Sequence, residues 1–193
     1  MDIDSLTLDL RGIVEIDEDR FFQLCQRHEL IRFERNADGT IVVMPLVGAL
    51  TSNRNCCLTA QLGEWNREEI LGVAFGSCTG FTLPNGAVRS PSAAWIKRDR
   101  WDSLSREQRE VFAPVCPDFV VELRSQRDSL SRLQTKMNEY LENGTRLGWL
   151  IDLETQQVEI YRPHREVEVL DAPTSLSGED VLPGCVLKLE SIW

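Results

Sequence analysis

Apolar residues recur along the chain with spacings typical of helices and of strands. Three segments place apolar side chains on one helical face, namely Phe21, Phe22, Leu24 and Cys25; Leu58, Leu62 and Trp65; and Leu130, Leu133, Met137, Tyr140 and Leu141. These faces predict amphipathic helices that begin after Asp17, run over residues 51–69, and open at Asp128. The pair Asn143-Gly144 is typical of a left-handed cap at the end of the third helix.

Shorter apolar runs bounded by turn residues predict strands. The signals Asp38-Gly39 and Pro84-Asn85-Gly86 each join two such runs into a hairpin. The predicted strands cover residues 31–35, 40–44, 80–83, 88–95, 117–124, 149–153, 158–161 and 186–189. The order of helices and strands indicates an α/β (α+β) domain with a mixed β-sheet flanked by α-helices. We expect a single domain over residues 1–193, in which residues 1–15 form an N-terminal extension.

Composition narrows the class of protein. The 193 residues include 31 Asp and Glu against 21 Lys and Arg, with a formal net charge of −10 and 42% hydrophobic content. These values fit a globular chain rather than a disordered one. The acidity argues against broad wrapping of nucleic acid, which depends on Lys and Arg. Because no apolar run approaches ~20 residues and no signal-peptide pattern is present, we expect no membrane association and a cytoplasmic location.

The cysteines do not form a zinc motif. The six cysteines lack paired spacing and the chain has two histidines, so free buried thiols are the favoured interpretation. Cys78 lies in Gly76-Ser77-Cys78-Thr79-Gly80, which matches the nucleophile-elbow pattern with Cys in place of Ser. That pattern requires a strand before it and a helix after it. Because residues 81–86 resemble a strand entering a turn, we favour a turn over a Cys78-dependent hydrolase.

Two charged residues interrupt the most apolar predicted strand. Alternation along a strand places Glu122 and Arg124 on the same face. A buried charge costs several kcal/mol unless it is paired or bound to a metal. One interpretation is an internal ion pair of Glu122 with Arg124 or with Lys136. The other is a metal-ligating carboxylate beside cations that hold a scissile phosphate.

The chain contains several sequence motifs whose order along the chain is distinctive. They are FTLPNGAVRSPSAAW (residues 81–95), PDFVVELRS (residues 117–125), Lys136, Asn143-Gly144, WLID (residues 149–152) and LSGEDVLPG (residues 176–184). In this order they resemble the Uma2 family, a group abundant in cyanobacteria, formerly a domain of unknown function and assigned as restriction endonucleases. The resemblance extends from about Ile16 to Trp193 and implies a restriction endonuclease-like PD-(D/E)xK core.

The resemblance also implies roles for individual residues. Glu122 matches the acidic metal ligand of the E-x-K half-motif, and Arg124 stands where that motif has Lys. Lys136 matches a family lysine that supplies the catalytic cation from the following helix. Glu34 matches an acidic residue near the metal site. The implied activity is hydrolysis of DNA phosphodiesters assisted by Mg²⁺ (or Mn²⁺), with Glu122 and Glu34 on the metal. Nuclease analogy and exposed strand edges also favour a homodimer.

The chain departs from the family pattern at two places. Ser92 replaces the Asp of the Pro-Asp motif, and a neutral hydroxyl is a poor ligand for Mg²⁺. Asp118 does not replace the missing carboxylate, because four strand residues separate it from Glu122 by roughly 13 Å, so we interpret Asp118 as a surface or loop-anchoring residue. The second departure is Ala49-Leu50-Thr51, where family members often carry a polar or acidic residue.

Positive charge is concentrated in one segment. Residues 97–136 contain nine Lys or Arg and seven Asp or Glu, so this segment carries +2 and the rest of the chain −12. A phosphate-facing edge and a solvated surface with compensating ion pairs both predict this composition. The cations include Arg98, Arg100, Arg106, Arg109, Arg127 and Arg132.

Two functional hypotheses follow. The first is a Uma2-type metal-dependent endonuclease that cleaves DNA. The second, favoured by Ser92, is a catalytically impaired homologue that acts as a nucleic-acid or protein binding module.

Overall fold

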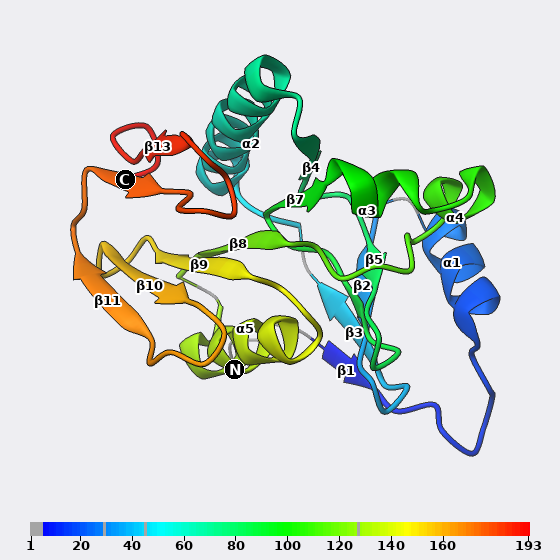
Figure 1. The fold of residues 1–193 in the computed structure, drawn as a ribbon. Coiled ribbons are helices and arrows are strands. Elements are labelled where there is room, and N and C mark those ends of the chain that lie inside the picture. Colours follow the sequence, from blue (N-terminus) through cyan, green and yellow to red (C-terminus); the bar gives the residue numbers. More distant parts are fainter. Residues whose placement is uncertain (1–5, 29, 45, 127) are drawn as a thin grey trace.

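The strands build a six-stranded sheet, a five-stranded sheet and a two-stranded hairpin. The two sheets lie next to each other and meet near the middle of the view in Figure 1. The computed structural model describes residues 6–28, 30–44, 46–126 and 128–193. Helix α2 (Ala49–Glu69) lies on one side of the larger sheet, and helix α5 (Leu130–Glu142) lies on the other. The predicted α/β architecture with helices flanking a mixed sheet is therefore confirmed.

The larger sheet has six strands in the order β11–β10–β9–β8–β7–β4. Its strands are β4 (Gly72–Gly76), β7 (Ala93–Lys97), β8 (Phe119–Arg124), β9 (Leu147–Asp152), β10 (Gln157–Tyr161) and β11 (Glu168–Asp171). The sheet is mixed, because β8 pairs antiparallel with β7 and parallel with β9. Parallel neighbours need a crossover connection, which α5 supplies between β8 and β9.

Alternation along β8 sends its side chains to two different layers. The odd-numbered residues of β8 and β9 pack on the α2 side of the sheet. Val120 instead packs with Met137 and Tyr140 of α5. Because side chains alternate along a strand, Glu122 and Arg124 share the face of Val120 and lie on the α5 side. The otherwise apolar layer under α5 must therefore accommodate two charged groups at the end of β8.

The smaller sheet has the order β1–β3–β2–β6–β5 and is antiparallel. Its strands are β1 (Leu6–Leu8), β2 (Arg32–Arg35), β3 (Ile41–Met44), β5 (Phe81–Thr82) and β6 (Val88–Arg89). Helix α1 (Glu18–Arg27), capped by Asp17 as predicted, covers the sheet and buries Phe21 against Ile41 and Val88. Part of the predicted N-terminal extension thus forms a strand, while residues 1–5 lie outside the described residues.

The chain passes from one sheet to the other at Ser90-Pro91-Ser92. The prediction of one strand over residues 88–95 is therefore wrong, because β6 and β7 are separate and belong to different sheets. Proline has no N–H to donate to a ladder, so pairing is interrupted at Pro91. Past the interruption, the Leu123 N–H donates to the Ser92 Oγ over 3.0 Å. The break sets Ser92 beside the end of β8.

Helix ends follow local capping chemistry. Between β7 and β8 lie two short helices, α3 (Arg98–Asp102) and α4 (Arg106–Glu110), and Ser105 with Gln108 forms a capping box at α4. Helix α5 begins slightly later than predicted, because its cap is Ser129. After its last turn Gly144 has a φ of 113°, in the left-handed region expected for this position.

The C-terminal hairpin completes the α2 side of the larger sheet. It consists of β12 (Ser175–Ser177) and β13 (Val186–Lys188), and its inward residues Leu176 and Leu187 join the cluster around α2. In the part of the chain that the structure describes, no helix has the length and apolar content to cross a bilayer.

Cys78 lies exposed in a turn after β4, and residues 77–80 lead into β5 without forming a helix. The turn interpretation is confirmed, and the strand-turn-helix context of a nucleophile elbow is missing. All six cysteines are free, as predicted. Only Cys116 and Cys185 are buried, so the expectation of burial holds for these two.

We expect Leu150→Ala to lower the free energy of unfolding by about 2–5 kcal/mol, because Leu150 is fully buried in the layer under α5. The matched control is Leu50→Ala at a side chain that is 62% exposed, for which the change should stay below about 0.5 kcal/mol. Urea unfolding followed by tryptophan fluorescence measures both. Equal losses for the two variants would contradict the assignment of the core.

Candidate functional site

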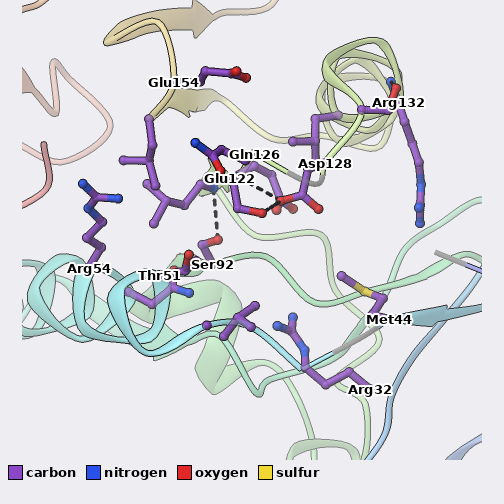
Figure 2. Close-up of a pocket in the computed structure, with 18 of the residues that line it drawn as sticks. Arg32, Met44, Thr51, Arg54, Ser92, Glu122, Gln126, Asp128, Arg132 and Glu154 are labelled. Atoms are coloured by element: carbon purple, nitrogen blue, oxygen red, sulfur yellow. Dashed lines mark hydrogen bonds between the residues drawn. The ribbon is translucent and has the colours of Figure 1, made fainter. Parts of the chain in front are cut away.

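A pocket of about 640 Å³ opens where the end of β8, strand β2 and helices α2 and α5 converge (Figure 2). Four of the predicted site residues line it, namely Glu34, Ser92, Glu122 and Lys136. Glu34 comes from the smaller sheet, Glu122 from the larger sheet and Lys136 from α5. Residues of both sheets and of α5 are therefore needed to form the pocket.

The ammonium group of Lys136 bridges the two glutamates. Its Nζ lies 2.7 Å from the Oε1 of Glu34 and 2.7 Å from the Oε1 of Glu122. All three residues are buried, with exposed fractions of 1% for Glu34, 5% for Glu122 and 8% for Lys136. Of the two internal ion pairs considered for Glu122, the structure contains the one with Lys136. Such buried charges are tolerated only when they are paired and hydrogen-bonded.

Further polar groups contact the two carboxylates. The backbone N–H of Ser90 donates to Glu34 Oε1 over 2.8 Å, and Arg89 Nη1 lies 3.5 Å from Glu34 Oε2. The hydroxyl of Tyr140 donates to Glu122 Oε1 over 3.1 Å. The site is a connected network, which favours one arrangement of the two sheets and α5.

The two carboxyl groups have opposite shifts in pKa. Burial raises the pKa of Glu34, but the charges of Lys136 and Arg89 outweigh burial, so this pKa lies below its ordinary value of 4.5. Burial raises the pKa of Glu122 above 4.5, and the nearby Glu34 carboxylate adds to the rise despite Lys136. Burial also raises the pKa of Tyr140 well above 10.0, so its hydroxyl stays protonated and donates to Glu122.

Arg124 lies outside the pocket wall, although it shares a strand face with Glu122. Its Nη1 lies 2.6 Å from Asp152 Oδ2 and its Nη2 lies 3.4 Å from Glu154 Oε2. Its Nε donates to the carbonyl oxygen of Asp128. Because Arg124 is the register partner of Asp152 in β9, the guanidinium joins the ends of two parallel strands. The structure therefore does not bring Arg124 together with the other four predicted site residues.

The residues of the pocket do not fit a divalent metal ion. A hard cation such as Mg²⁺ prefers carboxylate oxygens, and the two carboxylates here share the ammonium of Lys136. The third position is the neutral Ser92 hydroxyl, whose oxygen already accepts a hydrogen bond from Leu123. Among the described residues, no group of three or more His, Cys, Asp or Glu is placed to hold a metal. The donor set thus lacks one carboxylate and contains a competing cation.

The cations of residues 97–136 are largely engaged within the protein. Asp118 accepts from the Lys97 N–H and pairs with Arg100 at 2.9 Å, which supports the loop-anchoring alternative. The surface alternative is wrong, because Asp118 is only 2% exposed. Arg127 lies outside the described residues, and Arg132 lines the pocket. These contacts favour the interpretation of compensating pairs around α3 and α4. The other pairs there are Lys97 with Asp99, Arg106 with Glu110 and Arg109 with Asp102.

Sequence reasoning missed several residues of the site. Tyr140 lies one helical turn after Lys136, so their spacing of four already indicates a shared face. Arg32 lies two residues before Glu34 in β2, and alternation places both on one face. Arg54 of α2 also lines the pocket. Nothing in the local pattern distinguishes Arg54 from an ordinary surface arginine.

Comparisons with known proteins agree with this architecture. A family model named Uma2, described as "Putative restriction endonuclease", matches residues 18–190. A crystal structure of a putative nuclease belonging to DUF820 from Anabaena variabilis superimposes with a TM-score of 0.75. It is 23% identical in sequence, and the match covers 92% of this chain and 97% of that chain. At that identity the likeness establishes the fold. No curated protein matches the sequence.

We expect Lys136→Met to destabilise the protein by about 3–5 kcal/mol near neutral pH, because it leaves two buried carboxyls without their shared cation. Without Lys136 the pKa of both Glu34 and Glu122 rises in the folded state. When the pKa of a carboxyl is higher in the folded than in the unfolded state, the free energy of unfolding falls as pH rises between the two values. The deficit should therefore be larger at about pH 8 than at about pH 5, measured by urea unfolding.

The control for this substitution is Lys97→Met, which removes an ion pair with Asp99 whose side chains are 54% and 82% exposed. It should cost less than about 1 kcal/mol at either pH. A loss for Lys136→Met that is independent of pH would contradict the assigned bridge.

Proposed function

The chain belongs to the Uma2 family, and from this premise we propose that it is a nuclease-like protein that binds nucleic acid in the pocket with little metal-dependent cleavage. The observation that carries the proposal is the buried ammonium of Lys136 between Glu34 and Glu122, together with Ser92 at the third position. The Lys136 ammonium offsets one of the two carboxylate charges. Contact with a phosphate backbone therefore falls to the other cations of the pocket wall.

The pocket supports contact with a sugar–phosphate backbone. Its wall includes Arg32, Arg54 and Arg132 in addition to Lys136. Arginine offers a planar fork of donors that matches phosphate oxygens. The same wall carries the carboxylates Glu34, Glu122, Asp128 and Glu154, so the lining of the pocket is balanced in charge while the chain as a whole carries −10. The acidic remainder of the surface therefore restricts contact with a backbone to this place.

A second candidate is an active endonuclease that cleaves DNA with Mg²⁺ or Mn²⁺. The observation that favours it is the gathering of Glu34, Glu122 and Lys136 in one pocket, as the family resemblance implies for a cleavage site. This candidate requires that a metal ion displace Lys136 from both carboxylates and bind without a carboxylate at residue 92.

Ser92→Asp tests the missing carboxylate directly. We expect negligible Mg²⁺ or Mn²⁺ binding by the native protein and at least about tenfold tighter binding by the variant, because Asp restores a hard oxygen ligand beside Glu122. Isothermal titration calorimetry measures both. Ser103→Asp is the control, since it adds the same charge at an exposed residue outside the pocket wall and should leave metal binding unchanged.

Nucleic-acid binding and cleavage are then assayed on the native chain. We expect fluorescence anisotropy to detect binding of DNA or RNA oligonucleotides that weakens as salt rises, and we expect no cleavage with Mg²⁺ or Mn²⁺. Robust metal-dependent cleavage that is abolished in Glu122→Gln would replace the first candidate with the second. Failure to bind any oligonucleotide at low salt would overturn the proposed function.

A further inference from the structure

The first turn of α2 opens into the pocket without a capping side chain. Its N-cap is Gly48, which makes no side-chain hydrogen bond, and its first turn contains no acidic residue. Gly48, Leu50 and Thr51 line the pocket. The first N–H groups of a helix lack intrahelical acceptors, and the helix dipole adds partial positive charge at this end. At 21 residues, α2 is long enough to present such an end.

The next turn of α2 adds two polar side chains with unsatisfied atoms in the same pocket. Arg54 lines the pocket, and its Nε is buried without a hydrogen-bond partner. Asn55 also lines the pocket, is only 8% exposed, and has a buried Oδ1 without a partner. Buried polar atoms without partners cost free energy. The Arg54 guanidinium and the Asn55 Nδ2 group are N–H donors, so an anion that enters the pocket can offer them acceptors. The Asn55 Oδ1 is itself an acceptor and is not satisfied by an anion.

A second arginine reaches the pocket from the smaller sheet. Arg32 of β2 also has a buried Nε without a partner, while its Nη2 donates to the carbonyl oxygen of Ser90. Figure 2 shows Arg32 and Arg54 coming from β2 and α2, with Thr51 between them in the view, and Gln126 and Asp128 on the opposite wall. The contact to Ser90 holds one edge of the Arg32 guanidinium in place.

The carboxylates of the pocket wall are engaged elsewhere. Glu34 and Glu122 share Lys136. Asp128 accepts from the backbone N–H and the hydroxyl of Ser125, and Glu154 pairs with Arg124. Arg54 makes no ion pair with a carboxylate among the described residues, and neither does Arg32. The charges of Arg54 and Arg32 are therefore available to an anion from outside.

We propose that the first turn of α2, together with Arg54 and Arg32, forms a phosphoryl-binding subsite. Helix N-termini bind phosphate groups through backbone N–H donors, and guanidinium groups bind them through paired donors. The subsite extends the proposed function, on which it rests, by naming the group that the pocket holds. The phosphoryl group can belong to a nucleic-acid strand or to a free nucleotide, since both present the same oxygens.

The first test measures binding of inorganic phosphate and of a 5′-phosphorylated DNA oligonucleotide by isothermal titration calorimetry. We expect Arg54→Gln and Arg32→Gln each to weaken both by at least about tenfold, because each removes a charge-assisted contact. The matched control is Arg67→Gln, an exposed arginine in the last turn of the same helix, which should bind within about twofold of the native protein.

A second variant separates binding from folding. Thr51→Glu places a carboxylate in the first turn of α2, where it favours the helix dipole and therefore should maintain or raise the unfolding temperature. The same carboxylate competes with the anion, so phosphate binding should fall by at least about tenfold. Loss of binding together with unchanged or raised stability supports the subsite. Native-like phosphate binding by Thr51→Glu and by both arginine variants overturns it.

The outcomes distinguish the subsite from the function on which it rests. If the native protein binds oligonucleotides and the three variants bind them equally well, the subsite is wrong and the proposed function stands. If phosphate binds and the variants lose it while no oligonucleotide binds, the subsite stands and the proposed function fails. A mononucleotide that binds as tightly as the oligonucleotide identifies a free nucleotide as the source, whereas tighter oligonucleotide binding identifies the strand.

Discussion

The buried ammonium of Lys136 is the contact on which the arrangement of the site depends. It holds Glu34 of the smaller sheet and Glu122 of the larger sheet at 2.7 Å each, so it links both sheets to α5. Burying any one of these charges alone costs far more than the pair or triad does. The relative placement of the two sheets therefore depends on this group of three charges. Tyr140 adds a hydrogen bond to Glu122, and Arg89 adds an ion pair with Glu34.

The break in strand pairing at Pro91 positions the hydrogen bonds and ion pairs of the pocket. Had residues 88–95 formed one strand, β6 and β7 would have continued in a single sheet, with Arg89 and Ser92 carried along it. Instead the break lets the Ser90 N–H reach Glu34 and lets Ser92 accept from Leu123. A missing backbone donor in one residue therefore determines how the pocket is assembled. The same geometry leaves Ser92 as a neutral group at the end of β8.

Most charged side chains described above form ion pairs within the protein, and only a few line the pocket. Arg100 of α3 and Arg106 and Arg109 of α4 pair with nearby acids. Arg124 joins the ends of β8 and β9. The arginines with unsatisfied Nε atoms at the pocket come from other parts of the chain, Arg32 in β2 and Arg54 in α2. A count of charges along a segment cannot separate these uses, because pairing depends on which residues meet in space.

The sequence by itself determined most of the elements, but it did not predict β4 or β11 and joined β6 to β7. Periodicity predicted α2, α5 and the buried strand β8, turn residues predicted the hairpins, and the motif order predicted the family. The resemblance implied a site of Glu34, Ser92, Glu122, Arg124 and Lys136, and all of these except Arg124 line one pocket. Only the tertiary structure decided that Arg124 binds Asp152 rather than the pocket, and that Arg54 reaches it. The physical reason is that local pattern fixes which face of an element a side chain occupies, whereas its partner is set by packing between distant segments.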